Sequence, residues 1–163
     1  MFTVFTNADG GKHDLSIDYD AKLRVQTQAG VSLFDLLEDK ATPFMQLISD
    51  PDKSIACAVA ILDLKGDALK AFYRGLRGDS ITRLQDALGN AIVDFFQDSR
   101  RRETAAKLLQ AWREFNEGLM KRAKIETDQM NPTLIAQTMV DAVEKHLTNE
   151  ASGKSGDSPG TSA

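Results

Sequence analysis

The sequence predicts a mainly α-helical fold of the α+β class, in which a short N-terminal β-hairpin precedes a bundle of about six to seven helices. Residues 2–17 alternate apolar and polar side chains on either side of residues 7–11, which have the composition of a turn. From residue 42 onward, apolar residues recur at intervals of three and four. Proline and glycine stand at the expected starts and ends of these helical segments.

The chain of 163 residues has room for one globular domain with a genuine core, which we place at residues 1–147. Within it we expect the hairpin at 1–17, a helical core at 18–97 and two longer helices at 101–147. Residues 148–163 are rich in glycine and serine and too poor in apolar side chains to offset the entropy of ordering them. This composition predicts a disordered, flexible C-terminal tail at residues 148–163.

The hairpin is marginal on its own, so one of its faces must pack on the helices. Residues 19–28 then fit both a strand and a helix, because their apolar positions satisfy both periods. The flanking residues favour the helix, since Asp18 or Asp20 can cap its start and Gly30 suits the left-handed position after its end. Ser32 caps a short second helix. The inward-facing residues of that second helix are Leu33, Leu36 and Leu37.

Thr42 and Pro43 combine a cap with proline at the first helical position and start a helix that residues 50–52 end. The apolar side of this helix is Phe44, Leu47 and Ile48. Residues 54–64 are nearly all small or aliphatic, which predicts a helix buried on most of its circumference with Cys57 in the core.

The helix after that covers residues 68–77 and stops at Gly78. We expect its inward side to contain Leu69, Phe72, Tyr73 and Leu76. Asp79 or Ser80 caps a clearly amphipathic helix over residues 81–97. The apolar positions that define this helix are Ile81, Leu84, Leu88, Ile92 and Phe95.

Residues 98–102 interrupt the helical pattern, and Arg100 to Arg102 are expected at a solvated corner between helices. A long helix follows over residues 101–124, with one apolar face. That face consists of Ala105, Leu108, Leu109, Trp112, Phe115, Leu119, Met120 and Ala123. Asn131 and a following proline start the final helix, which covers residues 132–147.

Charge and cysteine content exclude several classes of protein. A net charge of −4 removes the attraction to phosphate on which most nucleic-acid-binding proteins rely. The single cysteine forbids an internal disulfide and a cysteine-rich zinc site. The longest apolar stretch, residues 55–62, is too short to span a bilayer, and no signal peptide is recognisable at the N-terminus. We therefore expect a soluble, cytoplasmic protein without membrane attachment.

No group of residues predicts catalysis, so we expect a protein that is not an enzyme and has no metal or cofactor. The two histidines, His13 and His146, lack a neighbouring nucleophile or second ligand and are expected at the surface. Cys57 lies among aliphatic residues, which predicts an inert core thiol. The acidic pairs at residues 18 and 20 and at residues 50 and 52 stand where helix caps are needed, and capping explains them.

The large aromatic side chains supply the candidate partner-binding residues, Phe95, Phe96, Trp112 and Phe115. Packing between adjacent helices is their default role. A helix cannot turn both Phe95 and Phe96 fully toward one core, however, so one of them is available to anchor a partner. We expect the binding groove between the helix that ends with this pair and the helix that carries Trp112.

The order of elements at the N-terminus resembles that of tail assembly chaperones from long-tailed phages, prophages and gene transfer agents. The resemblance rests on residues 18–23 followed by residues 29–37, where a helix, a glycine and a small capped helix follow a hairpin. Residues 75–79 and 91–96 are also similar to prophage proteins of this kind. The resemblance covers roughly residues 1–100 as an order of elements and includes no catalytic residue.

This resemblance implies a non-enzymatic protein that binds the tape measure protein in the host bacterial cytoplasm during tail assembly. An amphipathic helix of the client would lie in an apolar groove of this protein. Several copies of the protein, which can include a homo-oligomer, would bind one client. Two alternatives remain open. One is a structural virion protein, for tail or head completion, that self-associates. The other is a small regulator that binds nucleic acid through Arg100 to Arg102, which the acidic total charge disfavours.

Overall fold

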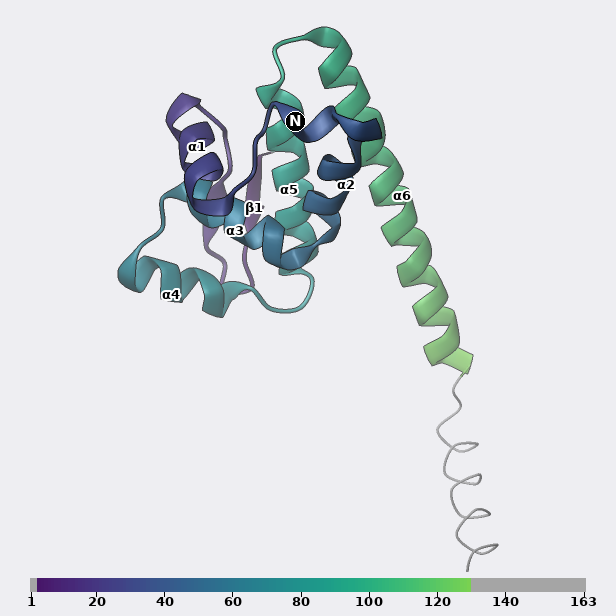
Figure 1. The fold of residues 1–163 in the computed structure, drawn as a ribbon. Coiled ribbons are helices and arrows are strands. Elements are labelled where there is room, and N and C mark those ends of the chain that lie inside the picture. Colours follow the sequence, from purple (N-terminus) through teal and green to yellow (C-terminus); the bar gives the residue numbers. More distant parts are fainter. Residues whose placement is uncertain (1–2, 130–163) are drawn as a thin grey trace, which may run out of the picture. The chain divides into compact units, whose positions relative to one another are not determined.

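A computed structural model describes residues 3–129 and confirms the predicted fold class, a two-stranded antiparallel hairpin followed by helices (Figure 1). The strands are β1 (Val4–Thr6) and β2 (Lys12–Asp14). The helices are α1 (Tyr19–Arg24), α2 (Thr42–Ser49), α3 (Pro51–Leu62), α4 (Gly66–Gly75), α5 (Ser80–Phe95) and α6 (Ser99–Gln129). Shorter helical turns are η1 (Val25–Ala29, of π type), η2 (Asp35–Leu37) and η3 (Asp39–Ala41), the last two of 3-10 type.

The ambiguous residues 19–28 are helical, as the flanking residues indicate. Asp18 caps α1 by accepting a hydrogen bond from the Ala21 N–H at 2.7 Å. After α1 the chain widens into the π turn η1 and ends at Gly30, whose φ of 67° is left-handed. Glycine takes this conformation without the steric cost that a Cβ brings, which explains why the helix stops there.

Arg24, at the end of α1, ties this first helix to α3. Its guanidinium donates to the carbonyls of Ala60 and Ile61, each at 2.9 Å. These carbonyls belong to the last turn of α3, where backbone acceptors have no partner within the helix. The Arg24 side chain, which belongs to α1, therefore supplies hydrogen-bond donors to the carbonyl groups at the end of α3.

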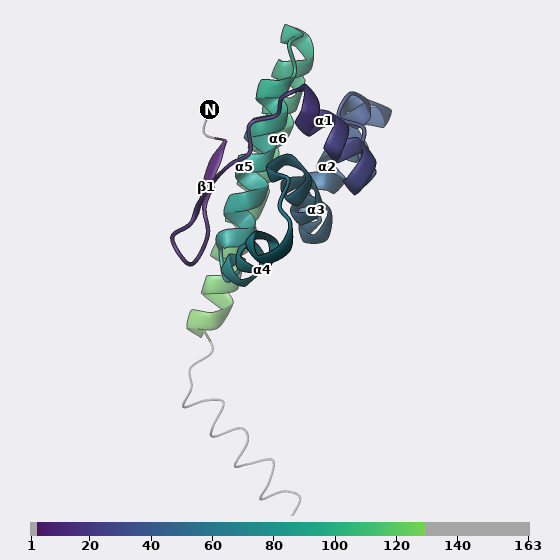
Figure 2. The same cartoon turned by 90° about the vertical axis from the view of Figure 1, so that its left-hand side faces the viewer.

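Helix α5 lies at the centre of the fold. Figure 2 shows β1 on one side of α5 and α2 and α3 on the other, and α5 contacts all three elements. Burial on both sides explains why α5 has apolar or small residues over most of its circumference. Its buried apolar side chains are Leu84, Ala87, Leu88, Ala91, Ile92 and Val93.

The hairpin packs on α4 and α5 through an aromatic cluster and a backbone contact. The ring of Phe5 stacks on that of His13 at 5.1 Å and meets Phe72 of α4 edge to face at 6.0 Å. The Ala8 N–H donates to the Gly75 carbonyl at 2.9 Å. These contacts supply the helical support that a lone hairpin requires.

Helices α2 and α3 meet at a capped corner. Asp50 caps α3 by accepting from the N–H groups of Asp52 and Lys53, at 3.0 and 3.2 Å. The buried Ser54 hydroxyl donates to the Leu47 carbonyl at 2.6 Å. Cys57 is buried among these helices, and desolvation raises the pKa of its thiol to about 12, which confirms the prediction of a core thiol.

The predicted break at residues 98–102 is present but lies at residues 96–98, because α6 already begins at Ser99. Asp98 caps it by accepting from the Arg101 N–H at 2.9 Å, so the three arginines lie in its first turns, where all three are exposed. A single capping residue is enough to restart the helix. The turn between α5 and α6 is shorter than the polar composition suggests.

The apolar face predicted for the long helix packs as expected only in its first half. Ala105, Leu109 and Trp112 are buried, and Arg113 bonds the side chains of Asp86 and Asn90 on α5. Beyond these residues the apolar face continues in the sequence but is exposed in the structure. The exposed large side chains there are Phe115, Leu119 and Met120.

Three local expectations also need correction. Tyr73, expected to point inward, is 51% exposed. Thr42 does not cap α2: Ala41 holds the cap position with a left-handed φ of 61°, and the Thr42 hydroxyl donates to the Asp39 carbonyl at 2.8 Å. The short helix expected after Ser32 is only the turn η2, although Leu33 and Leu36 are buried as predicted.

The chain divides into two units, residues 1–117 and 118–163. In the second unit the structure describes only the end of α6, up to Gln129. The final helix expected at 132–147, the tail at 148–163 and His146 lie outside the described residues. Among helices of the described part, none has the length and apolar character needed to cross a membrane.

Candidate protein-binding surface

Three aromatic side chains from separate segments gather at the surface of the first unit. Tyr19 on α1 is 69% exposed, Phe34 before η2 is 49% exposed, and Phe95 at the end of α5 is half-buried. The rings of Phe34 and Phe95 are 5.4 Å apart, and the ammonium of Lys22 lies 4.4 Å from the centre of the Phe34 ring and 5.2 Å from that of Tyr19. We call these four residues the aromatic surface.

Local sequence explains why these side chains point outward. In α1, Tyr19 and Lys22 are three residues apart and share one face, while Ala21 is buried on the other side of the helix. Leu33 is buried, so Phe34, its neighbour in an irregular segment, projects to the outside. At the end of α5, Phe96 is buried and Phe95 is left at the edge.

A hollow of about 480 Å³ lies beside the aromatic rings. Its lining consists of Ile17, Asp18, Tyr19, Lys22, Phe34, Phe95, Phe96, Gln97, Asp98 and Arg101. A smaller hollow of about 190 Å³ shares Phe34 and Arg101 with it and is also lined by Leu37, Glu38, Arg100 and Thr104. Phe34 therefore separates two adjoining depressions, which together suit an elongated segment better than a compact small molecule.

The charges around the surface differ in how they are bonded. Asp18 and Asp98 act as helix caps and accept from backbone N–H groups. Arg101 donates to the Phe34 carbonyl at 3.2 Å, and Arg102 donates to the Phe96 carbonyl at 3.0 Å. Two of the three consecutive arginines thus hold the backbone on which the aromatic side chains stand.

The four predicted binding residues are not brought together. Phe96 and Trp112 are buried in the core, at 3% and 4% exposure, although Phe96 contributes to the lining of the larger hollow. Phe95 belongs to the aromatic surface, and its ring is 5.9 Å from that of Phe96. Phe115 is 65% exposed on α6 and lines neither hollow.

Sequence reasoning missed Tyr19, Lys22 and Phe34. A signal for Phe34 exists in hindsight, since two large apolar residues in succession, Leu33 and Phe34, rarely face the same core. No comparable signal exists for Tyr19, because its proximity to Phe34 depends on how the π turn and the following loop reverse the chain direction.

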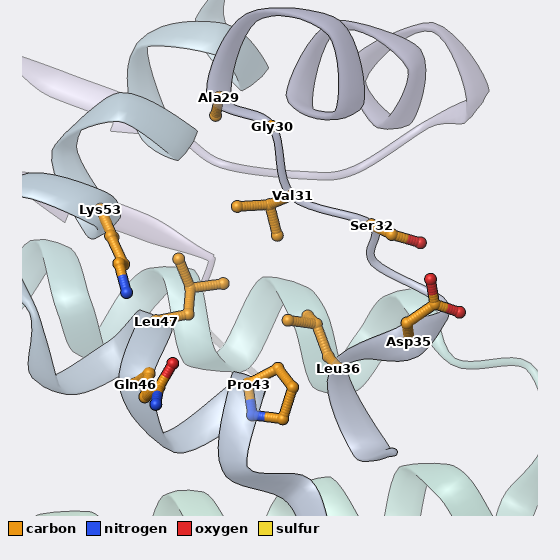
Figure 3. A pocket seen from close by; sticks show the side chains of 10 residues that line it. All are labelled: Ala29, Gly30, Val31, Ser32, Asp35, Leu36, Pro43, Gln46, Leu47 and Lys53. Atoms are coloured by element: carbon orange, nitrogen blue, oxygen red, sulfur yellow. The ribbon is translucent and has the colours of Figure 1, made fainter. Parts of the chain in front are cut away.

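A further hollow of about 310 Å³ lies between the loop after η1 and helix α2 (Figure 3). Val31, Leu36 and Leu47 form its apolar wall, and Lys53 and Asp35 stand on opposite sides of it. Residues 29–32 of the loop line this third hollow, whereas Phe34 lines the two hollows of the aromatic surface.

Residues of the described part do not form a cluster of three or more histidine, cysteine, aspartate or glutamate side chains that suits a metal ion. Every buried side-chain nitrogen or oxygen in that part has a hydrogen-bond partner. Asn7 is an example, because its buried amide oxygen accepts from the N–H groups of Asp9 and Gly11, at 3.1 and 2.7 Å. Its polar groups thus serve the hairpin turn.

Comparison of the chain with protein-family models, with curated proteins and with solved structures finds no match.

Proposed function

We propose that this protein is a non-enzymatic assembly chaperone that binds an apolar helical segment of another protein at the aromatic surface. The observation that carries the proposal is the exposed grouping of Tyr19, Phe34 and Phe95 beside a hollow. Aromatic side chains bury large apolar areas and are enriched among residues that dominate binding energy. Leaving them together in water is costly unless a partner covers them.

The resemblance of the N-terminal half to phage and prophage tail assembly chaperones supports a more specific client. We propose that the client is the tape measure protein, held in the host bacterial cytoplasm before the tail assembles around it. Such a client is long and helical, so several copies of a small binding domain can act on one chain. The hollows on either side of Phe34 provide an elongated site for one client helix.

Co-expression with the tape measure protein from the same gene cluster tests the proposal. We expect the chaperone to raise the soluble fraction of the client and to co-purify with it. The double variant Tyr19→Ala and Phe34→Ala should lose both effects, because it removes the exposed rings without touching the core. Tyr73→Ala is the matched control, since it removes another exposed ring, on α4. Rescue that is equal for all three proteins would reject the surface.

Self-association as a structural virion component is the second candidate, because Phe115, Leu119 and Met120 are exposed on α6. Sedimentation velocity distinguishes the two functions. A virion component should form stable oligomers that Phe115→Glu dissociates, whereas the chaperone should retain client binding in that variant. Client binding that disappears together with the oligomers would favour the structural role.

A further inference from the structure

We infer that the aromatic surface selects a partner segment that is acidic as well as apolar, a helix whose apolar side chains are flanked by glutamate or aspartate. The inference rests on the proposed function in one respect, that a partner binds at the aromatic surface. It adds the chemistry of that partner. The charged groups lining the two hollows carry it. They are Asp18, Lys22, Glu38, Asp98, Arg100 and Arg101.

The acidic and basic groups of this set are equal in number but differ in what they already bind. Asp18 and Asp98 each accept a hydrogen bond from a helix N-terminus, at 2.7 and 2.9 Å, where the helix dipole also stabilises a negative charge. Glu38 is the one acid of the set without such a capping bond. Most of the negative charge at the surface is therefore compensated within the fold.

Within residues 3–129, the basic groups of this set have no carboxylate that compensates their charge. Lys22, Arg100 and Arg101 take part in none of the ion pairs found among the described residues. Arg101 donates to a neutral carbonyl, which leaves its charge uncompensated. Lys22 is held over the rings of Phe34 and Tyr19, an arrangement that favours the cation without neutralising it.

The position of these cations matches the rim of an interface. Lys22 lies beside the larger hollow, Arg100 beside the smaller one, and Arg101 beside both. An apolar side chain of the partner that enters a hollow would bring the residues next to it within reach of these cations. Acidic residues at those positions gain attraction, and basic residues meet repulsion. The surface thus combines an apolar anchor site with a charge filter.

Fluorescence anisotropy with two labelled model peptides tests the inference on the full chain. Both peptides are amphipathic helices with the same leucine and phenylalanine face, and they differ in having glutamate or lysine at the flanking positions. At low salt we expect the glutamate peptide to bind about tenfold more tightly, and we expect the difference to shrink at high salt. The double variant Lys22→Glu and Arg100→Glu should reverse the preference.

Lys12→Glu is the matched control for charge, because Lys12 is exposed on β2 and lines neither hollow. It should leave the preference unchanged. Equal binding of both peptides, abolished by Phe34→Ala, would overturn the charge inference and leave the surface itself standing. Binding of neither peptide, or binding that survives Phe34→Ala, would reject the surface and the inference with it. Thermal unfolding of each variant verifies that it remains folded.

Discussion

At the scale of single residues, the turn before α2 stores backbone strain. Asp39, Lys40 and Ala41 have left-handed φ values of 46°, 57° and 61°, which non-glycine residues adopt at a cost of roughly 1 kcal/mol each. Lys40 is exposed, so its side chain contributes little packing there. The strain lets the chain reverse within three residues and places Pro43 at the start of the next helix.

Lys40→Gly should therefore stabilise the protein. Glycine accepts the left-handed conformation, so we expect the free energy of unfolding to rise by about 1 kcal/mol in urea titrations. The same substitution at Lys107, inside α6, should lower it by about 1 kcal/mol, because glycine is a poor helix former. If both substitutions destabilise equally, residue 40 is not left-handed in solution.

His13 gives the fold a pH dependence. Burial against Phe5 and Phe72 lowers the pKa of its ring from the ordinary value of 6.5, since desolvation disfavours the charged form. Above that value the ring is neutral in both states. As the pH falls below 6.5, His13 of the unfolded chain binds a proton while His13 of the folded protein stays neutral. The free energy of unfolding therefore decreases toward acidic pH.

We expect the melting temperature to fall between about pH 7.5 and about pH 5.5, and to fall less in His13→Phe, which keeps the ring stacking without the titrating group. Other titrating groups are common to both proteins, so the difference between the two melting curves isolates His13. Identical pH profiles would show that the His13 pKa is the same folded and unfolded.

At the scale of elements, periodicity predicted which residues share a helical face but not what covers that face. For α5 the predicted apolar face is also the buried one, because neighbouring elements surround the helix. For α6 the apolar spacing and the burial agree only as far as Trp112. The same spacing continues through Phe115, but nothing in the described first unit covers this side chain. Tyr73 is a similar case, sharing a helical side with residues of the core while its own ring stays in solvent.

Local chemistry predicted boundaries well where a single side chain decides them, as at Asp18 and Gly30. It placed the start of α6 two residues too late, at residue 101, because the arginines suggested a loop where Asp98 already caps the helix. The aromatic surface was predictable only in Phe95. Tyr19 and Phe34 reach it because the chain passes between them through the π turn η1 and the loop of residues 30–33, and the sequence does not fix the geometry of that segment.

The contact between the hairpin and α4 depends on a missing side chain. A Cβ added at Gly75 would lie 3.1 Å from the Cβ of Asn7 and 2.7 Å from its Cγ. Asn7 is buried and held by two hydrogen bonds of the hairpin turn, so it has little freedom to move. The close approach also allows the Ala8 N–H to reach the Gly75 carbonyl.

Gly75→Ala should push the hairpin away from α4 and lower the free energy of unfolding by about 2 kcal/mol, the usual range for overpacking. Gly118→Ala is the control, because among the described residues no atom outside the backbone of its own helix lies within 4 Å of a Cβ added there, and alanine favours the helix. It should be neutral or stabilising in the same chemical denaturation. A Gly75→Ala protein as stable as the parent would mean that the hairpin is not held in this contact.

At the scale of the whole molecule, the division into residues 1–117 and 118–163 makes a prediction about folding. All buried apolar residues found in the described part, from Phe5 to Trp112, belong to the first unit. The aromatic surface and both of its hollows belong to it as well. The first unit therefore contains both the core of the described part and the surface at which we propose that a partner binds.

A chain truncated after Glu117 should unfold cooperatively, with a melting temperature within a few degrees of the full chain, because it keeps the whole of this core. Trp112 is the sole tryptophan and is buried, so its emission reports on the packing of α6 against α5. Truncation after Thr104 removes the buried Leu109 and Trp112 and uncovers Gly89 of α5, on which Leu109 packs. This shorter chain should fail to unfold cooperatively by circular dichroism. If the chain ending at Glu117 also lacks a cooperative transition, the residues after it contribute to the core of the first unit, and the binding surface must then be studied only in the full-length protein.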